Sequence, residues 1–175
     1  MARSGHHTTC CGVTLPIKGR GRKIKQRIGF KYVSLVVAIA NDHAGVALKN
    51  ALLPEIAACG FTALDLGTNQ TESVDYPEYG HLVATAVSHG RATFGIAICG
   101  SGIGISVAAN RVPGIRAALC HSGLAAELAR AHNDANILCL GARLIGDLEA
   151  RECLRRFLTT AFEGGRHAAR VEKLG

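Results

Sequence analysis

Several residue types are scarce in this 175-residue chain, and each scarcity argues against a class of protein. Tryptophan is absent and aromatic residues make up 5% of the chain, so a core must rely on Ala, Val, Ile and Leu. No run of 18 apolar residues occurs, which argues against a membrane-spanning helix. No C-x-x-C pair occurs, and the seven cysteines are irregularly spaced. The sequence therefore predicts reduced thiols and a cytoplasmic location, rather than a disulfide framework or a zinc site.

Acidic residues are missing from the first 34 positions, where eight of the 20 Lys and Arg residues lie. Residues 35–175 carry twelve basic and thirteen acidic side chains and are close to neutral. The net charge of +7 thus belongs to the N-terminal segment, and the rest of the chain is not expected to bind nucleic acid. We expect a basic, disordered extension over residues 1–34 and a single domain over residues 35–175.

The purpose of residues 1–34 stays open between four interpretations. They form an appendage without function, follow from a misassigned start, act as an organellar transit peptide, or bind nucleic acid. Met1 is the only methionine, so no internal start is visible, and the segment is rich in Arg but poor in Ser. No apolar segment of 7–15 residues follows the charges, which disfavours a secretory signal. His6, His7, Cys10 and Cys11 lack a second ligand pair at a recognised spacing, so they do not predict a metal site.

From residue 35 onward, short apolar runs alternate with segments of helical periodicity. Strands are expected at residues 35–40, 61–66, 94–99, 115–120 and 137–140. Helices are expected at residues 44–59, 78–89 and 103–110, through Leu124 and Leu128, and at 147–162. Repeated βα units predict an α/β fold, a three-layer αβα sandwich around a five-stranded parallel sheet of the Rossmann-like type.

Three residues lead to more specific predictions about these helices. Pro54 lies inside the first helical stripe and should kink or split that helix. Leu82 is expected to face inward together with Val83. Asp147 is expected to be the N-cap of the last long helix.

The most informative segment is residues 96–106, in which an apolar run ends at Cys99 and glycines follow at 100, 102 and 104. This pattern predicts a buried strand, a loop with unpaired N–H groups, and the N-terminus of a helix. Such a loop can hold an anion, because the amides are free and the helix dipole favours negative charge. The same field is expected to lower the pKa of Cys99 towards a reactive thiolate.

Three familiar glycine loops do not fit this segment. A dinucleotide fingerprint needs G-x-G-x-x-G with an acid about 20 residues on, usually after the first strand. A Walker loop needs a lysine, and none occurs between Lys49 and Lys173. A thiol phosphatase needs an arginine six positions after its cysteine, where this chain has Ile105. A cradle for a developing oxyanion, or for the polar groups of a small ligand, remains.

Polar clusters follow four of the expected strands. They are Asn41-Asp42-His43, Asp75-Tyr76, Cys99-Gly100-Ser101 and Gly141-Ala142-Arg143. The carboxyl ends of parallel strands are where open α/β sheets bind ligands, so these clusters are expected to converge on one site.

The residues and their order resemble the ribose-5-phosphate isomerase B family, which includes subunits of galactose-6-phosphate isomerase. The resemblance covers about residues 35–174. It rests on Asn41-Asp42-His43-Ala44-Gly45, Asp65-Leu66-Gly67-Thr68, Asp75-Tyr76-Pro77, Cys99-Gly100-Ser101-Gly102-Ile103-Gly104, Ala108-Ala109-Asn110, Gly114-Ile115-Arg116-Ala117, His132-Asn133-Asp134-Ala135-Asn136, Gly141-Ala142-Arg143 and Gly164-Gly165-Arg166-His167.

The resemblance implies an aldose–ketose isomerase that needs neither a metal nor a cofactor and converts ribose 5-phosphate to ribulose 5-phosphate through an enediolate. By analogy, Cys99 is the base, Ser101 helps the loop amides to hold the enediolate oxygens, and His132 opens the furanose ring. The family has a branch with a glutamate base in the glycine loop, but that position here is Ile105, which places this chain in the cysteine branch. The substrate-binding residues implied in the same way are Asp42, His43, Tyr76, Gly100, Gly102, Ile103, Gly104, Asn133, Arg143, Arg166, His167 and Arg170.

Two other functions stay open at this point: isomerisation of a hexose 6-phosphate (allose or galactose), and a catalytically silent subunit that binds sugar phosphates. The presence of Cys99, Ser101 and His132 argues against silence. The resemblance also implies a homodimer, or a dimer of dimers, whose C-terminal segment reaches the neighbouring subunit. The Gly164-Gly165 pair after Phe162 is compatible with such an arm.

Overall fold

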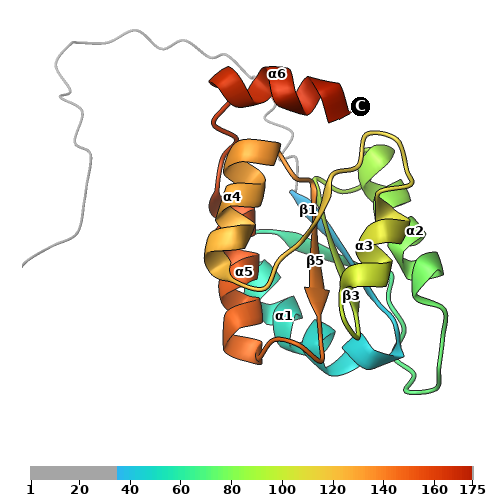
Figure 1. Cartoon of the computed structure of the whole chain (residues 1–175). Coiled ribbons are helices and arrows are strands. Elements are labelled where there is room, and N and C mark those ends of the chain that lie inside the picture. Colours follow the sequence, from blue (N-terminus) through green and yellow to red (C-terminus); the bar gives the residue numbers. More distant parts are fainter. Residues whose placement is uncertain (1–34, 175) are drawn as a thin grey trace, which may run out of the picture. The chain divides into compact units, whose positions relative to one another are not determined.

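The computed structural model describes residues 35–174, so the predictions for residues 1–34 lie outside the described residues. Its centre is a sheet of five strands in the order β2-β1-β3-β5-β4, and neighbouring strands in this order run parallel (Figure 1). The strands are β1 (Val36–Asn41), β2 (Thr62–Asp65), β3 (Phe94–Cys99), β4 (Ala117–Leu119) and β5 (Ile137–Gly141). The predicted five-stranded parallel sheet is confirmed.

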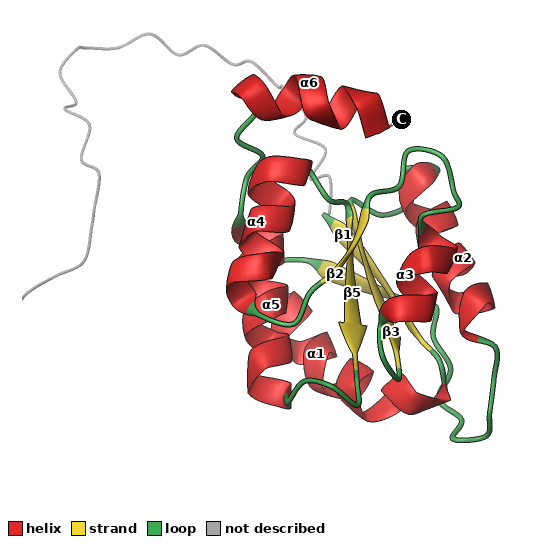
Figure 2. Ribbon diagram, in the orientation of Figure 1, coloured by secondary structure: helices red, strands yellow, loops and turns green. Residues whose placement is uncertain are grey.

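Helices cover both faces of this sheet, which gives the three layers that the sequence predicts (Figure 2). One face packs against α1 (Val46–Ala58), α4 (Gly123–Asn133) and α5 (Asp147–Thr159). The other face packs against α2 (Tyr76–Ser88) and α3 (Ile103–Ala109). The short elements are η1 (His43–Gly45), η2 (Gly165–His167), α6 (Ala168–Val171) and η3 (Glu172–Leu174).

Strand β3 shows how the alternation of side chains builds two cores. Ile96 and Ile98 point into the core beneath α1, α4 and α5, whereas Ala97 and Cys99 point into the core beneath α2 and α3. All four side chains are buried. Gly95 at the start of the strand lets α2 approach closely, because a Cβ there would collide with Val83. The alanine-rich composition therefore serves close packing of helices on the sheet.

The prediction that Pro54 splits its helix is wrong. Helix α1 runs without a break from Val46 to Ala58 with Pro54 inside it. Pro54 is exposed, and so is Asn50, whose carbonyl loses its intrahelical partner at the proline. Water can satisfy that carbonyl, so the helix continues.

Three further details of the helices differ from expectation. Leu82 is 47% exposed on the outer side of α2, although Val83 beside it is fully buried. Gly146, and not Asp147, is the N-cap of α5, and Asp147 is the first helical residue, where its charge still faces the helix dipole favourably. Tyr76 begins α2 rather than lying in the loop before it, with Asp75 at the N-cap position.

The strand order creates a crevice at one point of the sheet. The chain leaves β1 towards β2 on one side and later fills β3 on the other side of β1, so the connections diverge between β1 and β3. Ligands of open α/β sheets bind at such switch points, beyond the carboxyl ends of the strands. Within residues 35–174, no helix is long and apolar enough to cross a bilayer.

Candidate active site

A pocket of about 340 Å³ opens at this switch point. Its walls come from the segments that follow β1, β3 and β5, together with the start of α2. The lining residues are Asp42, Tyr76, Cys99, Gly100, Ser101, Gly104, Arg143 and Leu144. Seven of these eight were predicted as site residues from the sequence, and they converge as the strand-end argument expects.

Cys99 is the last residue of β3 and lies at the inner wall of the pocket, 3% exposed. The backbone N–H of Gly102 donates to its Sγ at 3.1 Å. The N–H of Ile103 donates to Ser101 Oγ at 3.2 Å. These amides were expected to be free for a ligand, but two of them already orient the thiol and the hydroxyl. The loop therefore positions Cys99 and Ser101 as well as offering a polar cradle.

Two glycines of the loop are required by their surroundings. Gly102 has φ of 75°, and a Cβ on it would lie 2.8 Å from the backbone carbonyl carbon of Leu140. A Cβ on Gly104 would lie 2.6 Å from the ring of Tyr76. Because Tyr76 packs directly over Gly104, the aromatic ring closes one side of the pocket. Gly104→Ala is expected to push this ring out of place.

Asp42 follows β1 and is held by the backbone around it. Its Oδ1 accepts from the N–H of Ala44 at 2.9 Å. The preceding Asn41 donates from Nδ2 to the carbonyls of Asp42 and Thr68. Nearby, the N–H of Val74 donates to His43 Nδ1 at 3.2 Å, which ties His43 to the segment before Tyr76.

Lys49 holds the loop that follows β2, next to Asp42 at the pocket wall. This residue was not among the predicted site residues. It is fully buried on α1 and its Nζ reaches Asp65 at 3.0 Å. The same Nζ donates to the carbonyl of Thr68 and to Asn69 Oδ1. Thr68 in turn holds Asn41, so the ammonium anchors the chain next to Asp42. A lysine three residues before the buried Leu52, on an otherwise apolar face, is the sequence signal that marks it.

Replacing Lys49 with methionine is expected to lower the free energy of unfolding by about 3 kcal/mol, because Asp65 and the Thr68 carbonyl lose a buried charged partner. Chemical denaturation of the full chain measures this change. Lys173→Met at an exposed position is the matched control and should change the stability by less than about 0.5 kcal/mol. Equal stability of the two variants would contradict the anchoring role of Lys49.

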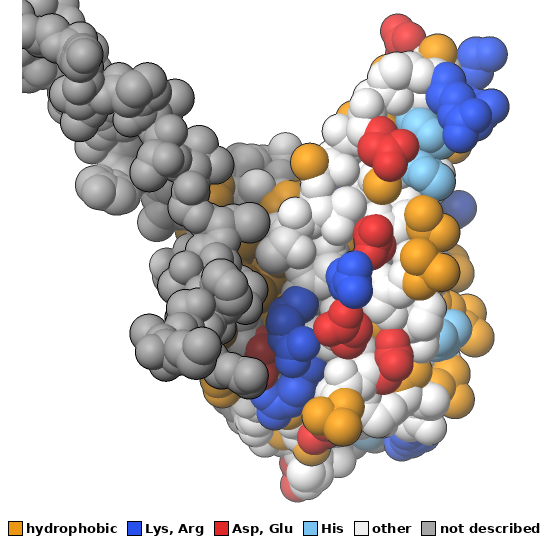
Figure 3. Space-filling model, turned by 90° about the vertical axis from the view of Figure 1, so that its left-hand side faces the viewer, with side chains coloured by type: hydrophobic (Ala, Val, Ile, Leu, Met, Phe, Trp, Pro, Cys, Tyr) orange, Lys and Arg blue, Asp and Glu red, His pale blue; other side chains and the backbone are white. Residues whose placement is uncertain are grey.

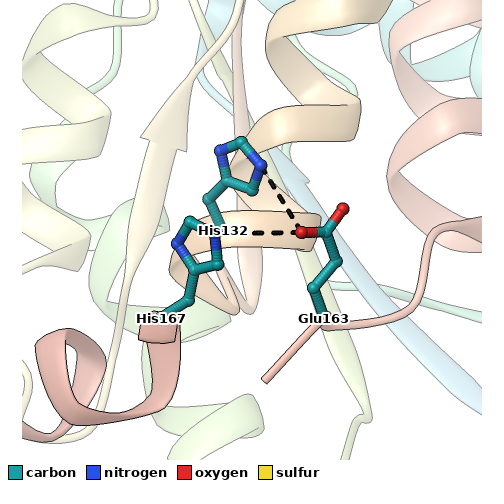
Figure 4. A group of neighbouring side chains, drawn as sticks. All are labelled: His132, Glu163 and His167. Atoms are coloured by element: carbon teal, nitrogen blue, oxygen red, sulfur yellow. Dashed lines mark ion pairs between the residues drawn. The ribbon is translucent and has the colours of Figure 1, made fainter. Parts of the chain in front are cut away.

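A second group of predicted site residues lies at the opposite edge of the sheet. His132 is near the end of α4, just before β5 begins, whereas Cys99 pairs with Gly141 at the end of β5. The His132 ring stacks on His167 with centroids 4.3 Å apart and planes 3° from parallel. Glu163 Oε2 lies 3.7 Å from Nε2 of His132 and 3.8 Å from Nε2 of His167 (Figure 4).

Several contacts hold the end of α4 and fix the backbone at His132. Asp134 adopts the left-handed conformation with φ of 45° and caps the helix. Its carboxylate pairs with Arg130 at 2.8 Å and with Arg116 at 2.9 Å. Arg130 also stacks over the ring of Phe94 at 4.8 Å. The aromatic and charged contacts together secure the turn between α4 and β5.

Positive charge gathers around these histidines. Arg166 Nε donates to His167 Nε2 at 3.4 Å, and Arg170 follows on α6. Figure 3 shows Lys and Arg side chains next to His side chains at the end of the molecule that carries α6. Burial lowers the pKa of His167, and the neighbouring His132 and Arg166 add to this effect. His167 is therefore a neutral imidazole near pH 7.

The structure thus brings most of the predicted residues together in two groups, whereas His43, Gly102 and Ile103 do not line the pocket. The pocket holds Asp42, Tyr76, the glycine loop with Cys99 and Ser101, and Arg143. The other edge holds His132, Asn133, Arg166, His167 and Arg170. Glu163 and Leu144 belong to these groups but were missed, because a lone glutamate and a lone leucine give no signal in one sequence.

Comparisons with known proteins identify the family of this chain. The sequence model of the Ribose/Galactose Isomerase family matches residues 37–174. Ribose-5-phosphate isomerase B of Escherichia coli (strain K12) is 42% identical over 138 residues, which cover 79% of this chain and 93% of that protein.

Solved structures give the same result. Ribose-5-phosphate isomerase B of Clostridium thermocellum matches with a TM-score of 0.79 at 48% identity, covering 81% of this chain and 95% of that one. The type B ribose 5-phosphate isomerase of Trypanosoma brucei matches with a TM-score of 0.79 at 44% identity. The match covers 81% of this chain and 97% of that one. The match to the family model spans most of the chain, and the expected resemblance is confirmed. The chain therefore belongs to the ribose/galactose isomerase family and is an isomerase.

Proposed function

We propose that this chain interconverts ribose 5-phosphate and ribulose 5-phosphate without a metal ion, with Cys99 as the base. The observation that carries the proposal is the thiol at the wall of the strand-end pocket, held by the Gly102 N–H at 3.1 Å. The similarity to ribose-5-phosphate isomerases B supports the pentose phosphate as substrate.

The proposed chemistry is a proton transfer between neighbouring carbons. The Cys99 thiolate removes the proton from C2 of the open-chain aldose, which forms an enediolate with the negative charge on the C1 oxygen. The proton of the C2 hydroxyl passes to the C1 oxygen, and the Cys99 thiol returns its proton to C1, which gives the ketose. The Gly102 N–H stabilises negative charge on the sulfur while the substrate is bound. Ser101 and the remaining loop amides hold the enediolate oxygens, whose negative charge develops only during the reaction. Asp42 binds a sugar hydroxyl, and Tyr76 closes the pocket beside it.

His132 opens the furanose ring in this proposal, and Asn133 binds a hydroxyl group. Both lie at the amino edge of the sheet, with the arginines and histidines that would bind the phosphate. Cys99 lies at the carboxyl edge, where it pairs with Gly141. A single five-carbon sugar cannot reach both edges of one sheet. We therefore infer a homodimer in which each pocket receives His132 and the C-terminal arm from the partner copy.

The surroundings of the pocket support a second copy there. Ile103 and Val107 lie one turn apart on α3 and are 54% and 59% exposed. Leu144 at the pocket wall is 58% exposed. A partner surface at this position would bury these exposed apolar side chains around the substrate. Because His132 stacks on His167, His132 would enter the pocket of the partner copy together with the arm.

A substrate assay tests the proposal directly. Purified protein in EDTA is expected to isomerise ribose 5-phosphate, with allose 6-phosphate and galactose 6-phosphate tested in parallel. A clear preference for a hexose phosphate would show that the substrate is a hexose rather than a pentose phosphate. Activity only after addition of a metal would contradict the proposed metal independence. Inactivity on all three sugar phosphates would favour the silent-subunit alternative.

His132→Asn is expected to reduce turnover of cyclic ribose 5-phosphate by at least about 100-fold, because a general acid/base for ring opening is lost. An open-chain aldose phosphate too short to form a furanose ring should be affected far less. The ratio of kcat/KM for the two substrates measures the effect. Equal losses on both substrates would show that His132 does not act specifically in ring opening.

A further inference from the structure

The group formed by His132, Glu163 and His167 has a feature that isomerisation does not require. Two imidazole Nε2 atoms face one carboxylate oxygen, at 3.7 and 3.8 Å, and the three donor atoms all lie within 4.8 Å of one another (Figure 4). Two histidines and one carboxylate form a common protein ligand set for zinc. Among residues 35–174, these three side chains form the one such group.

We infer that these three side chains bind a divalent borderline metal ion such as Zn²⁺ and that the bound ion inhibits the isomerase. The binding site does not depend on the proposed function, whereas the inhibition does, since it assumes that His132 acts on the substrate. The ion has no role in turnover.

The distances are close to those that zinc needs. Bonds of about 2.0–2.1 Å in tetrahedral geometry place ligand atoms about 3.3 Å apart, so each histidine must approach Glu163 by about half an ångström. The parallel rings cannot both direct a lone pair at one ion, so one ring must turn. His132 can do so, because its side chain is 37% exposed, whereas the His167 side chain is packed.

The position of the group on the surface favours coordination. The Glu163 side chain is 59% exposed, so an ion can reach the group from solvent. Three protein ligands leave a fourth position for water or an anion.

Two neighbouring arginines oppose the metal. Arg166 Nε donates to His167 Nε2 at 3.4 Å, and the ion must displace it from that nitrogen. The positive charges of Arg166 and Arg170 also repel a dication. The structure thus predicts opposite effects of two substitutions at adjacent sites: Arg166→Ala should tighten zinc binding, and Glu163→Gln should weaken it.

Calorimetric titration of the full chain with ZnCl₂, in a buffer that does not chelate, tests the site. His6, His7, Cys10 and Cys11 are replaced by Ala or Ser in every sample, so that these other ligand types do not contribute. One ion per chain is expected. Glu163→Gln and His167→Asn should each weaken binding by at least about tenfold, while Arg166→Ala should tighten it.

Two controls separate this site from others. Cys99→Ser should still bind the ion, because zinc at the catalytic thiol is the main competing explanation. His121→Asn, at an exposed position after β4, should leave binding unchanged. Absence of zinc binding, or binding that is lost in Cys99→Ser but kept in Glu163→Gln and His167→Asn, would overturn the proposal.

The functional consequence is measured separately. Zinc should lower isomerase activity over the same concentrations at which it binds, and EDTA should restore it. If the protein binds zinc at these residues but lacks isomerase activity in EDTA, the metal site stands and the proposed function fails. If it is active but Glu163→Gln and the parent bind zinc equally, the function stands and the metal site fails.

Discussion

Cys99→Ala is expected to lower kcat for ribose 5-phosphate by at least about 100-fold while leaving KM within a few-fold of the parent. The substitution removes the base that moves the proton, and general bases typically contribute factors of about 10² to 10⁴. It leaves Asp42, Tyr76 and Arg143 on the pocket walls, so sugar-phosphate binding should persist. Steady-state kinetics with EDTA present gives both constants, and calorimetry on the variant measures binding without turnover.

The matched control for this substitution is Cys120→Ala. Cys120 is also buried, but burial raises the pKa of its thiol to about 11, so it stays protonated near pH 7 and cannot act as a base. Its replacement should leave kcat within about threefold of the parent, although it creates a small cavity in the core. Activity of Cys99→Ala within about tenfold of the parent would refute the assignment of Cys99 as base.

The fold was largely predictable from residues 35–174 because apolar runs and polar strand ends recur in order. The run that ends at Cys99 and the glycines after it correctly predicted β3, the loop and α3. The wrong predictions concern helix continuity at Pro54 and the orientation of Leu82, which depend on exposure to solvent and on packing against the sheet. Pro54 is tolerated because its face of α1 is exposed, and Leu82 is exposed because α2 presents Val83 to the sheet instead.

The members of the candidate site were proposed from the sequence, whereas its division into two groups was not. The motif order pointed to Cys99 and His132 as members of one site, but the parallel sheet places them at opposite edges. That separation follows from the direction of β5, which starts just after His132 and ends beside Cys99. Lys49 was missed because only the fold brings its partners against α1: Asp65 at the end of β2 and Asn69 on the loop that follows.

The separation of Cys99 from His132 and the arm leads to a second prediction with a large effect. Two inactive variants are expected to recover activity when their subunits are mixed. Cys99→Ala and Arg166→Ala are each expected to be nearly inactive, the first in proton transfer and the second in phosphate binding. If each pocket combines Cys99 of one copy with the arm of the other, a mixed dimer has one pocket with both defects and one with none. After random exchange of subunits, about one quarter of the parent activity should therefore return. The assay is turnover of ribose 5-phosphate, with exchange followed by native mass spectrometry.

Two further mixtures show which residues travel together. Cys99→Ala with His132→Asn should also recover activity, because His132 stacks on His167 at the same edge of the sheet. Cys99→Ala with Asp42→Asn should not, because both residues line one pocket of one chain and every pocket of the mixed dimer keeps a defect. The Asn side chain can still accept from the Ala44 N–H, so this control keeps the local backbone. If exchange is confirmed but activity does not return in the mixtures of Cys99→Ala with Arg166→Ala and with His132→Asn, each chain builds its site alone. The arm and α4 would then move towards Cys99 of their own chain when substrate binds.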